Sequence, residues 1–436
     1  MIREGFGILV FCGSALGFVP WAEAAGRIVH SADEVCPAAS DPCVVSSLIV
    51  VPDETVLDFG TRTLTITGKG QFRLAGWNIQ VLCGSLVAST GDAFAIRQRR
   101  GESPQGYATL KARRRCSGDA FPCLQDSDCT AGTCSVGDGS IDLDGAVQSG
   151  GALGGEISLH AAGDVVLSRD VTSRRQQYFY LGVHSYGGAM DVTGDVRLTS
   201  LDDGVLYEAS GDIRIDGKTA LLGNGYSSND VDVFSSSGNV DVRNDIDVSA
   251  HGLNGEGGTV YLTAHGDISI EGGTAEDPLT IAANGARRAY PAYGDGGRLH
   301  VQSDDGDIVI GPHAEFLARA ATPDAYAGYI QATASLGDIS FAGTVRVEGG
   351  KSSSSAFEGC HVTLASGSSI SLTHELGRFV GKAHESLLVE TGAALVNSAG
   401  TNEFKYRAGT PAPVVNGTVT PTATLTEDGT LSSCGP

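Results

Sequence analysis

Short runs of alternating apolar and polar residues, separated by glycine-containing turns, extend over most of the chain. Residues 258–270 (GTVYLTAHGDISI) alternate, turn at Gly266-Asp267 and alternate again, and residues 155–167 and 297–310 repeat the pattern. A period of two predicts β-strands with one buried face. Because strands this short are not stable alone, the pattern predicts stacked copies that share one continuous core.

A Gly-Asp/Asn-Ile/Val tripeptide recurs along the chain at intervals of 17 to 40 residues. A loose period is typical of a solenoid, which tolerates insertions on its turns. We expect each copy to form a turn, in which Gly takes a positive φ and Asp bonds its own backbone. The seven pairs are Gly163-Asp164, Gly194-Asp195, Gly211-Asp212, Gly238-Asn239, Gly266-Asp267, Gly306-Asp307 and Gly337-Asp338.

A column of aspartates at successive turns also suits calcium, a hard cation that prefers carboxylate oxygens. The nonapeptide GGxGxDxUx of calcium-binding β-rolls is absent from the sequence. The structural interpretation of the aspartates is therefore favoured, with calcium as the alternative, and we expect no cofactor or other metal.

The run GGxVxLxAxGDIxI resembles the repeats of filamentous-haemagglutinin-like exoproteins, which are bacterial exported proteins. The resemblance covers roughly residues 137–400. It implies an all-β, right-handed parallel β-helix. Members of that family are often adhesins or surface-displayed stalks, so the resemblance also implies an adhesive or structural role.

The order of segments predicts an exported protein. Arg3, an apolar stretch from Gly5 to Trp21 and the small-x-small sequence Ala22-Glu23-Ala24 are typical of a signal peptide over residues 1–24. No other stretch approaches transmembrane length, so we expect a secreted or cell-surface protein that is not integral to a membrane. The remaining segments are an N-terminal cap with the first coils (25–97), a basic, Cys-rich insertion (98–137), the repeat body (138–408) and a Thr/Pro-rich tail (409–436).

Cysteine usage agrees with export. The disulfide candidates are Cys36, Cys43, Cys116, Cys123, Cys129, Cys134, Cys360 and Cys434. Cys36 and Cys43 are spaced for a local bridge, and Cys434 is a candidate partner for Cys360. Zinc is the alternative for the cluster at 116–134, but that cluster has no CxxC and no nearby His. One cysteine of the exported chain remains unpaired or pairs between chains.

The formal charge of −22 argues against nucleic acid and anionic membranes as partners. Within this acidic chain, Arg113-Arg114-Arg115 in the insertion form a local basic cluster. The cluster is either a contact for an anionic glycan, a processing site or part of a solvated loop. The oligomeric state stays open.

No catalytic motif is found, because GxSxG, HExxH, a Walker loop and a dinucleotide fingerprint are all absent in a suitable context. Two segments place Arg beside Tyr, which suits either stacking on sugars or packing over the solenoid. These candidate glycan contacts are Arg174, Tyr178 and Tyr180, and Arg288, Tyr290 and Tyr293.

The sequence therefore predicts an exported β-helix protein with a structural or adhesive role, whose ligand is a carbohydrate or another cell-surface molecule. The alternative is a polysaccharide lyase or glycoside hydrolase on the same scaffold. Such an enzyme needs paired carboxylates near a basic group, and Asp202-Asp203 and Asp304-Asp305 are the candidates. This alternative rests on analogy between folds.

Overall fold

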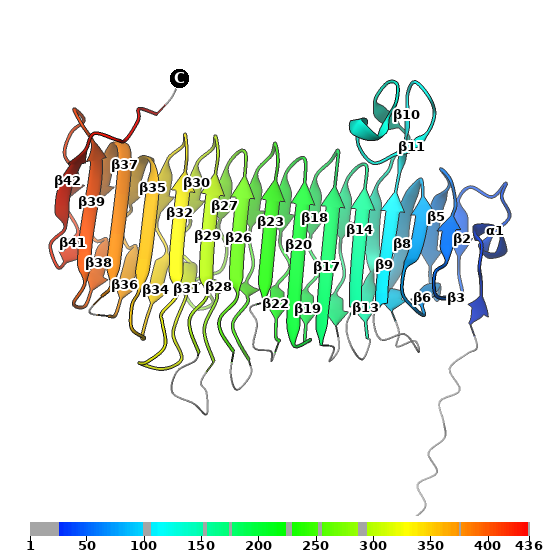
Figure 1. Cartoon of the computed structure of the whole chain (residues 1–436), viewed down its shortest axis with the longest axis horizontal. Helices are drawn as coiled ribbons and strands as arrows, with labels where there is room; N and C mark the ends of the chain where they lie inside the picture. The colour runs from blue at the N-terminus through cyan, green and yellow to red at the C-terminus, as the bar shows by residue number, and fades with distance from the viewer. Residues whose placement is uncertain are drawn as a thin grey trace, which may run out of the picture.

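The chain forms one elongated parallel β-solenoid of about 15 turns, which confirms the all-β parallel β-helix expected from the sequence. The computed structural model describes residues 26–98, 106–150, 155–173, 177–223, 229–251, 255–286, 294–374 and 376–434. Coils lie side by side along the long axis in chain order, from the blue N-terminal end to the red C-terminal end (Figure 1). The signal peptide predicted over residues 1–24 lies outside the described residues.

Each complete coil contributes one strand to each of three parallel sheets, here named sheets I, II and III. Sheet I has the longest strands in the repeat body. It consists of β4 (Val56–Asp58), β7 (Ile79–Cys83), β9 (Gly106–Ala112), β14 (Gly155–Ala161), β17 (Tyr178–Ser185), β20 (Asp202–Ala209), β23 (Asp230–Ser235), β26 (Thr259–Ala264), β29 (Arg298–Ser303), β32 (Tyr329–Ala334), the first parts of β35 (Ser354–Leu364) and β37 (Arg378–Val389), β39 (Thr401–Arg407) and β42 (Thr424–Asp428).

Sheet II follows sheet I along each coil and carries the residues after six of the seven Gly-Asp/Asn pairs. It consists of β2 (Cys43–Val45), β5 (Thr63–Thr67), the first parts of β8 (Ser85–Gln98) and β13 (Ile141–Ser149), β15 (Val165–Leu167), β18 (Met190–Val192), β21 (Ile213–Ile215), β24 (Val240–Val242), β27 (Ile268–Ile270), β30 (Ile308–Ile310), β33 (Ile339–Phe341), the last parts of β35 and β37, and β40 (Val414–Val415).

Sheet III closes each coil. It consists of β1 (Arg27–Ile28), β3 (Leu48–Val51), β6 (Gln71–Leu74), the last parts of β8 and β13, β16 (Val171–Ser173), β19 (Val196–Leu198), β22 (Thr219–Leu221), β25 (Ile246–Asp247), β28 (Leu279–Ala282), β31 (Ala314–Leu317), β34 (Thr344–Val347), β36 (Ser369–Leu372), β38 (Ala394–Asn397) and β41 (Thr418–Thr420).

The core consists of the side chains at every second position of each strand. These side chains face inward and stack from coil to coil. In β26, for example, Val260, Leu262 and Ala264 are buried while the residues between them face outward. Near the C-terminal end the core holds a series of four phenylalanines, Phe341 from sheet II and Phe357, Phe379 and Phe404 from sheet I, and successive ring centroids lie 5.2, 5.6 and 6.2 Å apart. The tilted and edge-to-face arrangements are those that aromatic rings prefer.

The corner between sheets I and II, here the first corner, is held by side chains of the Gly-Asp pairs. The Oδ1 atom of Asp267 accepts the backbone N–H of Asp307 in the next coil at 2.8 Å, and Oδ1 of Asp307 accepts that of Asp338 at 2.8 Å. The same bond joins Asp164 to Ala189, Asp212 to Asn239, Asn239 to Asp267 and Asp338 to His361. The side chains of these pairs thus accept hydrogen bonds from backbone N–H groups of the next coil. The sequence had predicted that they accept from the backbone of their own turn, and at these pairs this prediction is wrong. Calcium binding by this column stays a prediction.

The glycines of these pairs serve close approach between coils, and not the positive φ that the sequence suggested. Gly163, Gly211, Gly238, Gly266, Gly306 and Gly337 are absent from the described glycines with positive φ. A Cβ atom on Gly337 would lie 2.0 Å from the carbonyl oxygen of Gly306, and a Cβ atom on Gly266 would lie 2.3 Å from the Asn239 side chain. A larger residue would therefore force neighbouring coils apart.

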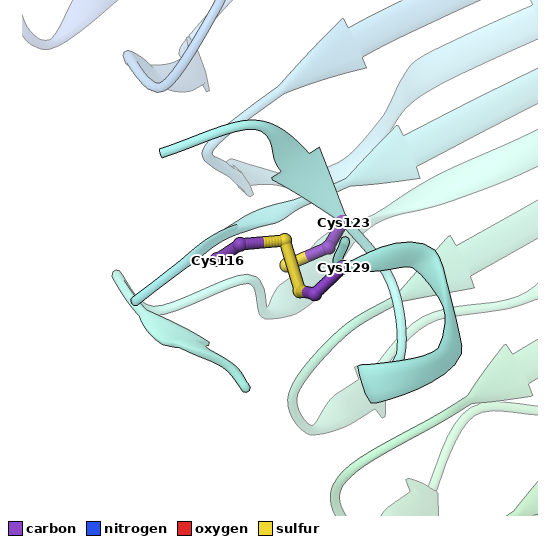
Figure 2. A group of neighbouring side chains, drawn as sticks. All are labelled: Cys116, Cys123 and Cys129. Carbon is purple, nitrogen blue, oxygen red and sulfur yellow. A yellow bond between two sulfur atoms is a disulfide. The ribbon is translucent and has the colours of Figure 1, made fainter. Parts of the chain in front are cut away.

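A small Cys-rich knot, residues 113–136, projects from the first corner beside β9 and β14 (Figure 1). It contains β10 (Arg114–Cys116), β11 (Pro122–Cys123), β12 (Cys134–Val136) and the short 3-10 helix Asp126–Asp128, and β10 pairs antiparallel with both other strands. Disulfides join Cys116 to Cys129 (Figure 2) and Cys123 to Cys134. The sequence predicted an insertion over residues 98–137, but residues 106–112 form β9 within sheet I because they continue the alternating pattern.

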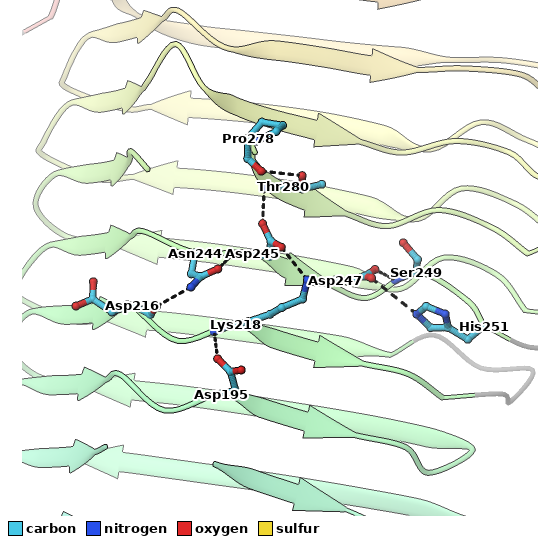
Figure 3. A network of polar contacts seen from close by, with 10 residues as sticks. All are labelled: Asp195, Asp216, Lys218, Asn244, Asp245, Asp247, Ser249, His251, Pro278 and Thr280. Carbon is cyan, nitrogen blue, oxygen red and sulfur yellow. Dashed lines mark hydrogen bonds and ion pairs between the residues drawn. The ribbon is translucent and has the colours of Figure 1, made fainter. Parts of the chain in front are cut away.

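Gly194-Asp195 lies at a different turn from the other six pairs, namely the corner between sheets II and III. There Oδ1 of Asp195 accepts the backbone N–H of Lys218 at 2.9 Å. The Lys218 ammonium in turn donates to Oδ2 of Asp245 in the next coil at 2.8 Å, and Oδ1 of Asp245 accepts the N–H of Thr280 at 2.8 Å (Figure 3). A lysine can therefore replace an aspartate in this column because its charge pairs with the carboxylate of the next coil.

Both ends of the solenoid carry a disulfide, as the sequence suggested. Cys36 and Cys43 are joined beside the helix α1 (Ala32–Val35) at the N-terminal end, and Cys360 is joined to Cys434 at the C-terminal end. The region 409–436, expected to be a linker-like tail, instead contains β40, β41 and β42 of the last coil, because its Thr/Val segments still form short strands. Among the described residues, no helix has the length and apolar character needed to cross a membrane.

The phenylalanine series predicts a large effect of one substitution. Phe357→Ala removes a ring that is 1 % exposed and packs between two others, so we expect the free energy of unfolding to fall by about 3–5 kcal/mol. Denaturant unfolding followed by circular dichroism measures the change. Phe234→Ala is the control, because that ring is 40 % exposed on the same sheet, and an equal loss of stability in the two variants would contradict the assignment of the core.

Candidate binding face

The outward side of sheet I is the broadest regular surface of the solenoid. Its strands in the repeat body are mostly six to eight residues long, whereas those of sheets II and III are mostly three or four. Because parallel strands stack in register, outward side chains of successive coils form rows about 4.8 Å apart. This surface is here called the sheet I face.

Three aromatic rings of neighbouring strands are in contact on the sheet I face. Tyr261 of β26 and His300 of β29 are in register and stack with centroids 4.9 Å apart, and the ring of Tyr329 in β32 lies 5.6 Å from His300. The Tyr329 hydroxyl donates to Oε1 of Gln331 at 3.0 Å, which fixes the ring. Phe234 of β23, the strand preceding β26, is another outward aromatic residue and is 40 % exposed. The four residues, here the aromatic track, cross four neighbouring strands diagonally.

A groove of about 560 Å³ opens at the Tyr329 end of the track. Glu256, Asp295, Arg298 and Tyr326 line it together with Tyr329. Oδ1 of Asp295 accepts the backbone N–H of Tyr326 at 2.8 Å, so one carboxylate positions the loop that carries the exposed Tyr326 ring. The groove thus combines two aromatic rings with both signs of charge.

A second, smaller cleft of about 170 Å³ lies between the sheet I face and the Cys-rich knot. His184, Tyr186 and Glu208 line it from the solenoid side, and Gln125 lines it from the knot. Oε2 of Glu208 lies 2.8 Å from Nδ1 of His184. The knot therefore forms one wall of a polar cleft.

The knot is rigid and attached to the solenoid. Its half-cystines Cys116, Cys123 and Cys134 pack against Ala162 at the first corner. The sulfurs of Cys116, Cys123 and Cys129 lie within 4.8 Å of one another, but each belongs to a disulfide, so no thiolate is available for the zinc alternative (Figure 2).

The basic cluster Arg113-Arg114-Arg115, at the start of the knot, attaches the knot to neighbouring coils. Arg113 donates to Oδ1 of Asp58 at 2.6 Å, Arg114 to the Asp138 carbonyl at 3.1 Å, and Arg115 to Oγ1 of Thr61 at 2.7 Å. These three hydrogen bonds indicate that the arginines anchor the knot to the solenoid. A glycan contact or a processing site at this cluster stays untested.

The predicted Arg/Tyr contacts are only partly described. Arg174, Arg288, Tyr290 and Tyr293 lie outside the described residues. Tyr178 lies on the sheet I face with its hydroxyl 3.3 Å from that of Tyr107, two coils away. Tyr180 packs over neighbouring glycines, because a Cβ atom on Gly204 would lie 2.9 Å from its ring. For Tyr180 the contacts match the packing alternative, and sugar contacts at the other positions stay a prediction.

The two carboxylate pairs proposed for an enzyme lie at opposite ends of strands. Asp202 and Asp203 begin β20, whereas Asp304 and Asp305 follow β29 at the first corner, three strands further along sheet I. His265 lies 3.3 Å from Asp305, and Oδ1 of Asp304 accepts from Gln302. The structure does not bring the two pairs together into one site.

Asp203 is the most unusual of these carboxylates because it is only 5 % exposed. Its Oδ2 atom accepts the backbone N–H of Ser200 at 3.0 Å, whereas Oδ1 is buried without a hydrogen-bond partner among the described residues. Burial raises the pKa of Asp203 to about 7, the bonds from Ser200 lower it, and the charge of Asp202 raises it.

Sequence reasoning missed the aromatic track and the groove. Tyr261 and His300 lie five and six residues before their Gly-Asp pairs, so alignment of the repeats on those pairs would have brought them nearly into register. Tyr326 could not be found in this way, because it lies in a loop before β32.

No known protein family model matches this chain, and neither a curated protein nor a solved structure matches it. The resemblance to haemagglutinin-like repeats therefore rests on the sequence pattern and on the solenoid fold.

The buried Asp203 predicts a pH dependence of stability. Its pKa is higher in the folded state than in the unfolded state, so its stabilising contribution is complete below about pH 4 and is lost as the pH rises through about 7. The loss amounts to at most about 4 kcal/mol. In Asp203→Asn we expect this dependence to disappear and stability at pH 8 to increase.

Denaturant unfolding at pH 5 and pH 8 measures the effect. Asp304→Asn is the matched control, because Asp304 is exposed at the end of a strand of the same sheet. If Asp203→Asn and Asp304→Asn had the same pH dependence as the wild-type protein, the assignment to Asp203 would be wrong.

Proposed function

We propose that this protein is an exported structural and adhesive rod whose sheet I face binds a linear, neutral polysaccharide. The observation that carries the proposal is the aromatic track from Phe234 through Tyr261 and His300 to Tyr329, which ends at the groove. The groove and the track belong to consecutive coils, so one extended ligand can contact both.

Ring stacking supports a sugar ligand. Aromatic side chains pack against the apolar C–H groups of sugars. The faces of Tyr261 and His300 that are turned toward each other are covered by their stacking, so a sugar would contact the outward edges of these two rings, where the Tyr261 hydroxyl and the His300 ring nitrogens can form hydrogen bonds. Strands about 4.8 Å apart place β23 and β32, three steps from each other, about 14 Å apart. That length corresponds to about three sugar units, so the track suits a chain more than a single sugar.

The charges near the track support a neutral chain. Glu208 and Asp232 lie on the sheet I face beside Phe234 and Tyr261, and Glu256 and Asp295 line the groove. Among the described residues, Arg298 lines the groove and the Lys351 ammonium lies 5.7 Å from the centroid of the Tyr326 ring, so two cations lie beside these four carboxylates. Carboxylates near the path repel a polyuronate, whereas they accept hydrogen bonds from the hydroxyls of a neutral sugar.

The scaffold supports a role outside the cell. Four disulfides staple both ends and the knot, and such bonds persist in oxidising compartments. A stack of coils with no separate domains among the described residues offers a long, uniform face, which suits attachment to a polymer.

No specific observation favours an enzymatic role on the same scaffold, because the two carboxylate pairs proposed for it lie at opposite ends of strands that are three steps apart in sheet I. Product release from a bound polysaccharide is nevertheless an outcome that the binding experiment detects.

Loss of one ring from the track predicts weaker binding. Tyr329→Ala removes the ring shared by the track and the groove, and we expect about tenfold or more weaker binding to the best neutral polysaccharide. The measurement is binding of the purified protein to a panel of immobilised neutral and uronate-containing polysaccharides, with reducing ends assayed in parallel.

Tyr329→Phe is the matched control, since it keeps the ring and loses only the hydroxyl, and Phe121→Ala removes an exposed ring on the knot. Both should bind nearly as the wild-type protein does. Absence of binding to every neutral chain, or equal binding by Tyr329→Ala, would overturn the proposal. Preference for uronates would contradict the charge argument, and release of new reducing ends would favour the enzyme.

A further inference from the structure

We infer that the C-terminal end of the solenoid is a docking surface for a second copy of the same chain, and that two copies join there about a two-fold axis. The surface consists of the outer edges of β40, β41 and β42, the three strands of the last described coil. The inference does not depend on the proposed polysaccharide site.

The hydrophobic core is open at this end. The inward residue of each last strand is in register with a residue of the preceding coil that is fully buried. The pairs are Val415 with Val389, Val419 with Leu395, and Leu425 with Phe404. Val415 is nevertheless 41 % exposed, Leu425 is 46 % exposed and Val419 is only partly buried. Covering these three side chains with a second apolar surface is favourable, because it removes apolar area from water.

The chain beyond β42 runs back along the solenoid, away from this end (Figure 1). The Ser432 carbonyl oxygen lies 2.8 Å from Nδ1 of His384 in β37, and Cys434 is bonded to Cys360 in β35. These two strands precede β42 in sheet I by two and three coils. The described residues after β42 therefore lie along the first corner and leave the outer edges of the last coil uncovered.

An added β-strand is the partner that such edges fit. The outer side of an edge strand presents backbone N–H and C=O groups that its own sheet does not pair, and many proteins protect them with lysine or proline. The strands β40, β41 and β42 contain neither residue. Pro413 and Pro421 precede β40 and β42, so pairing is limited to the strands themselves.

The N-terminal end of another copy does not match this surface because it is closed. The helix α1 takes the place of a sheet I strand before β4, and its Ala32 and Val35 are buried. Arg27 of β1, in register with the buried Ile49, donates to the Val35 carbonyl at 2.8 Å. A helix and an inward-placed charge both block strand addition. The matching surfaces are therefore two C-terminal ends.

A two-fold axis through Leu425, perpendicular to sheet I, makes the two ends self-complementary. β42 then pairs antiparallel with the β42 of the second copy, and the two Leu425 side chains meet at the axis. The rotation exchanges sheets II and III, so Val415 of each copy faces Val419 of the other. The apolar core thus continues from one copy into the next.

The outward residues of sheet I agree with this pairing. Thr424 of one copy lies opposite Thr426 of the other, and cross-strand threonine pairs are favourable. Glu403 and Lys405 of β39 are in register with Thr424 and Thr426. Glu403 of one copy and Lys405 of the other therefore share a row, and their opposite charges favour this orientation.

The carboxylates of β42 do not oppose the pairing. Glu427 and Asp428 would lie opposite Ala423 and Thr422 of the second copy, so no like charges face each other across the axis. Within their own chain, Oε1 of Glu427 accepts the Gly409 N–H at 3.1 Å and Oδ1 of Asp428 accepts that of Thr430 at 2.9 Å.

The end of a single coil is a small interface, so we expect reversible dimers and not a permanent assembly. Because the axis is perpendicular to sheet I, both sheet I faces lie on the same side of the joined rod. This consequence gains a role if the proposed function holds, since one polysaccharide chain could then contact two aromatic tracks.

The experiment is sedimentation velocity of the purified protein at about 1 to 100 µM, without polysaccharide. We expect an equilibrium between monomer and dimer. Leu425→Lys places two ammonium groups opposite each other at the axis, so its dimer should be about a hundredfold weaker or more. Leu336→Lys is the matched control, because Leu336 is 53 % exposed at the first corner, and it should dimerise as the wild-type protein does.

Leu425→Cys supplies a second readout, because only a joint between two C-terminal ends brings two copies of this residue within disulfide distance. With oxidised glutathione we expect a covalent dimer, and Leu336→Cys should stay uncrosslinked. Circular dichroism checks the fold of each variant.

The inference is overturned if the wild-type protein stays monomeric at every concentration, or if its mass rises beyond the dimer, as a head-to-tail filament requires. Dimerisation of Leu425→Lys equal to that of the wild-type protein would also overturn it. If Leu425→Lys is unfolded, absence of the Leu425→Cys cross-link decides against the inference. Failure of polysaccharide binding changes none of these results.

Discussion

Every part of the structure depends on the register between one coil and the next. Parallel pairing satisfies the backbone groups of each short strand only if the neighbouring coil is present, so no coil is stable alone. The corner aspartates extend this pairing into the turns, since Oδ1 of Asp267 and of Asp307 accept the N–H groups that no sheet can reach. Glycine at the preceding position lets the coils approach closely enough for these bonds.

Register also creates the surface chemistry. Because each outward position repeats at the strand spacing, residues far apart in sequence become neighbours. Tyr261 and His300 stack although 39 residues separate them, and His160 stacks on His184 in the same way. Loops vary in length without disturbing the sheets, and one of them carries the disulfide-bonded knot that walls the second cleft. The rod thus supplies a rigid arrangement on which small changes in sequence build different sites.

The sequence predicted the fold better than the candidate site. Alternation such as Val260, Leu262 and Ala264 identifies the buried face directly, and the Gly-Asp pairs mark the corners. Two predicted details of these corners were wrong. The glycines allow close approach between coils and do not have a positive φ. The aspartates accept hydrogen bonds from the backbone of the next coil and not from their own turn. The Thr/Pro-rich end was mistaken for a tail because β41 and β42 are short and bury few residues. The alternation of apolar and polar residues is therefore weak in this segment.

The aromatic track escaped prediction because it exists only after the coils are aligned, and insertions of variable length hide that alignment in the sequence. The two disulfides of the knot were likewise undetermined, because four cysteines allow three pairings. Arg113 and Arg115 resembled a free basic patch, since nothing in the sequence indicates that Asp58 and Thr61, more than fifty residues earlier, lie within hydrogen-bond distance.

Native-state hydrogen exchange tests the central claim most directly, namely that side chains at the first corner continue the bonding between coils. The backbone amides of Asp307 and Asp338 lie in exposed turns, yet each donates to a carboxylate of the preceding coil. We predict that both are protected from exchange to nearly the extent of the amides in the adjacent strands. Exchange of both at the rates of an unstructured peptide, with the strands still protected, would contradict the account.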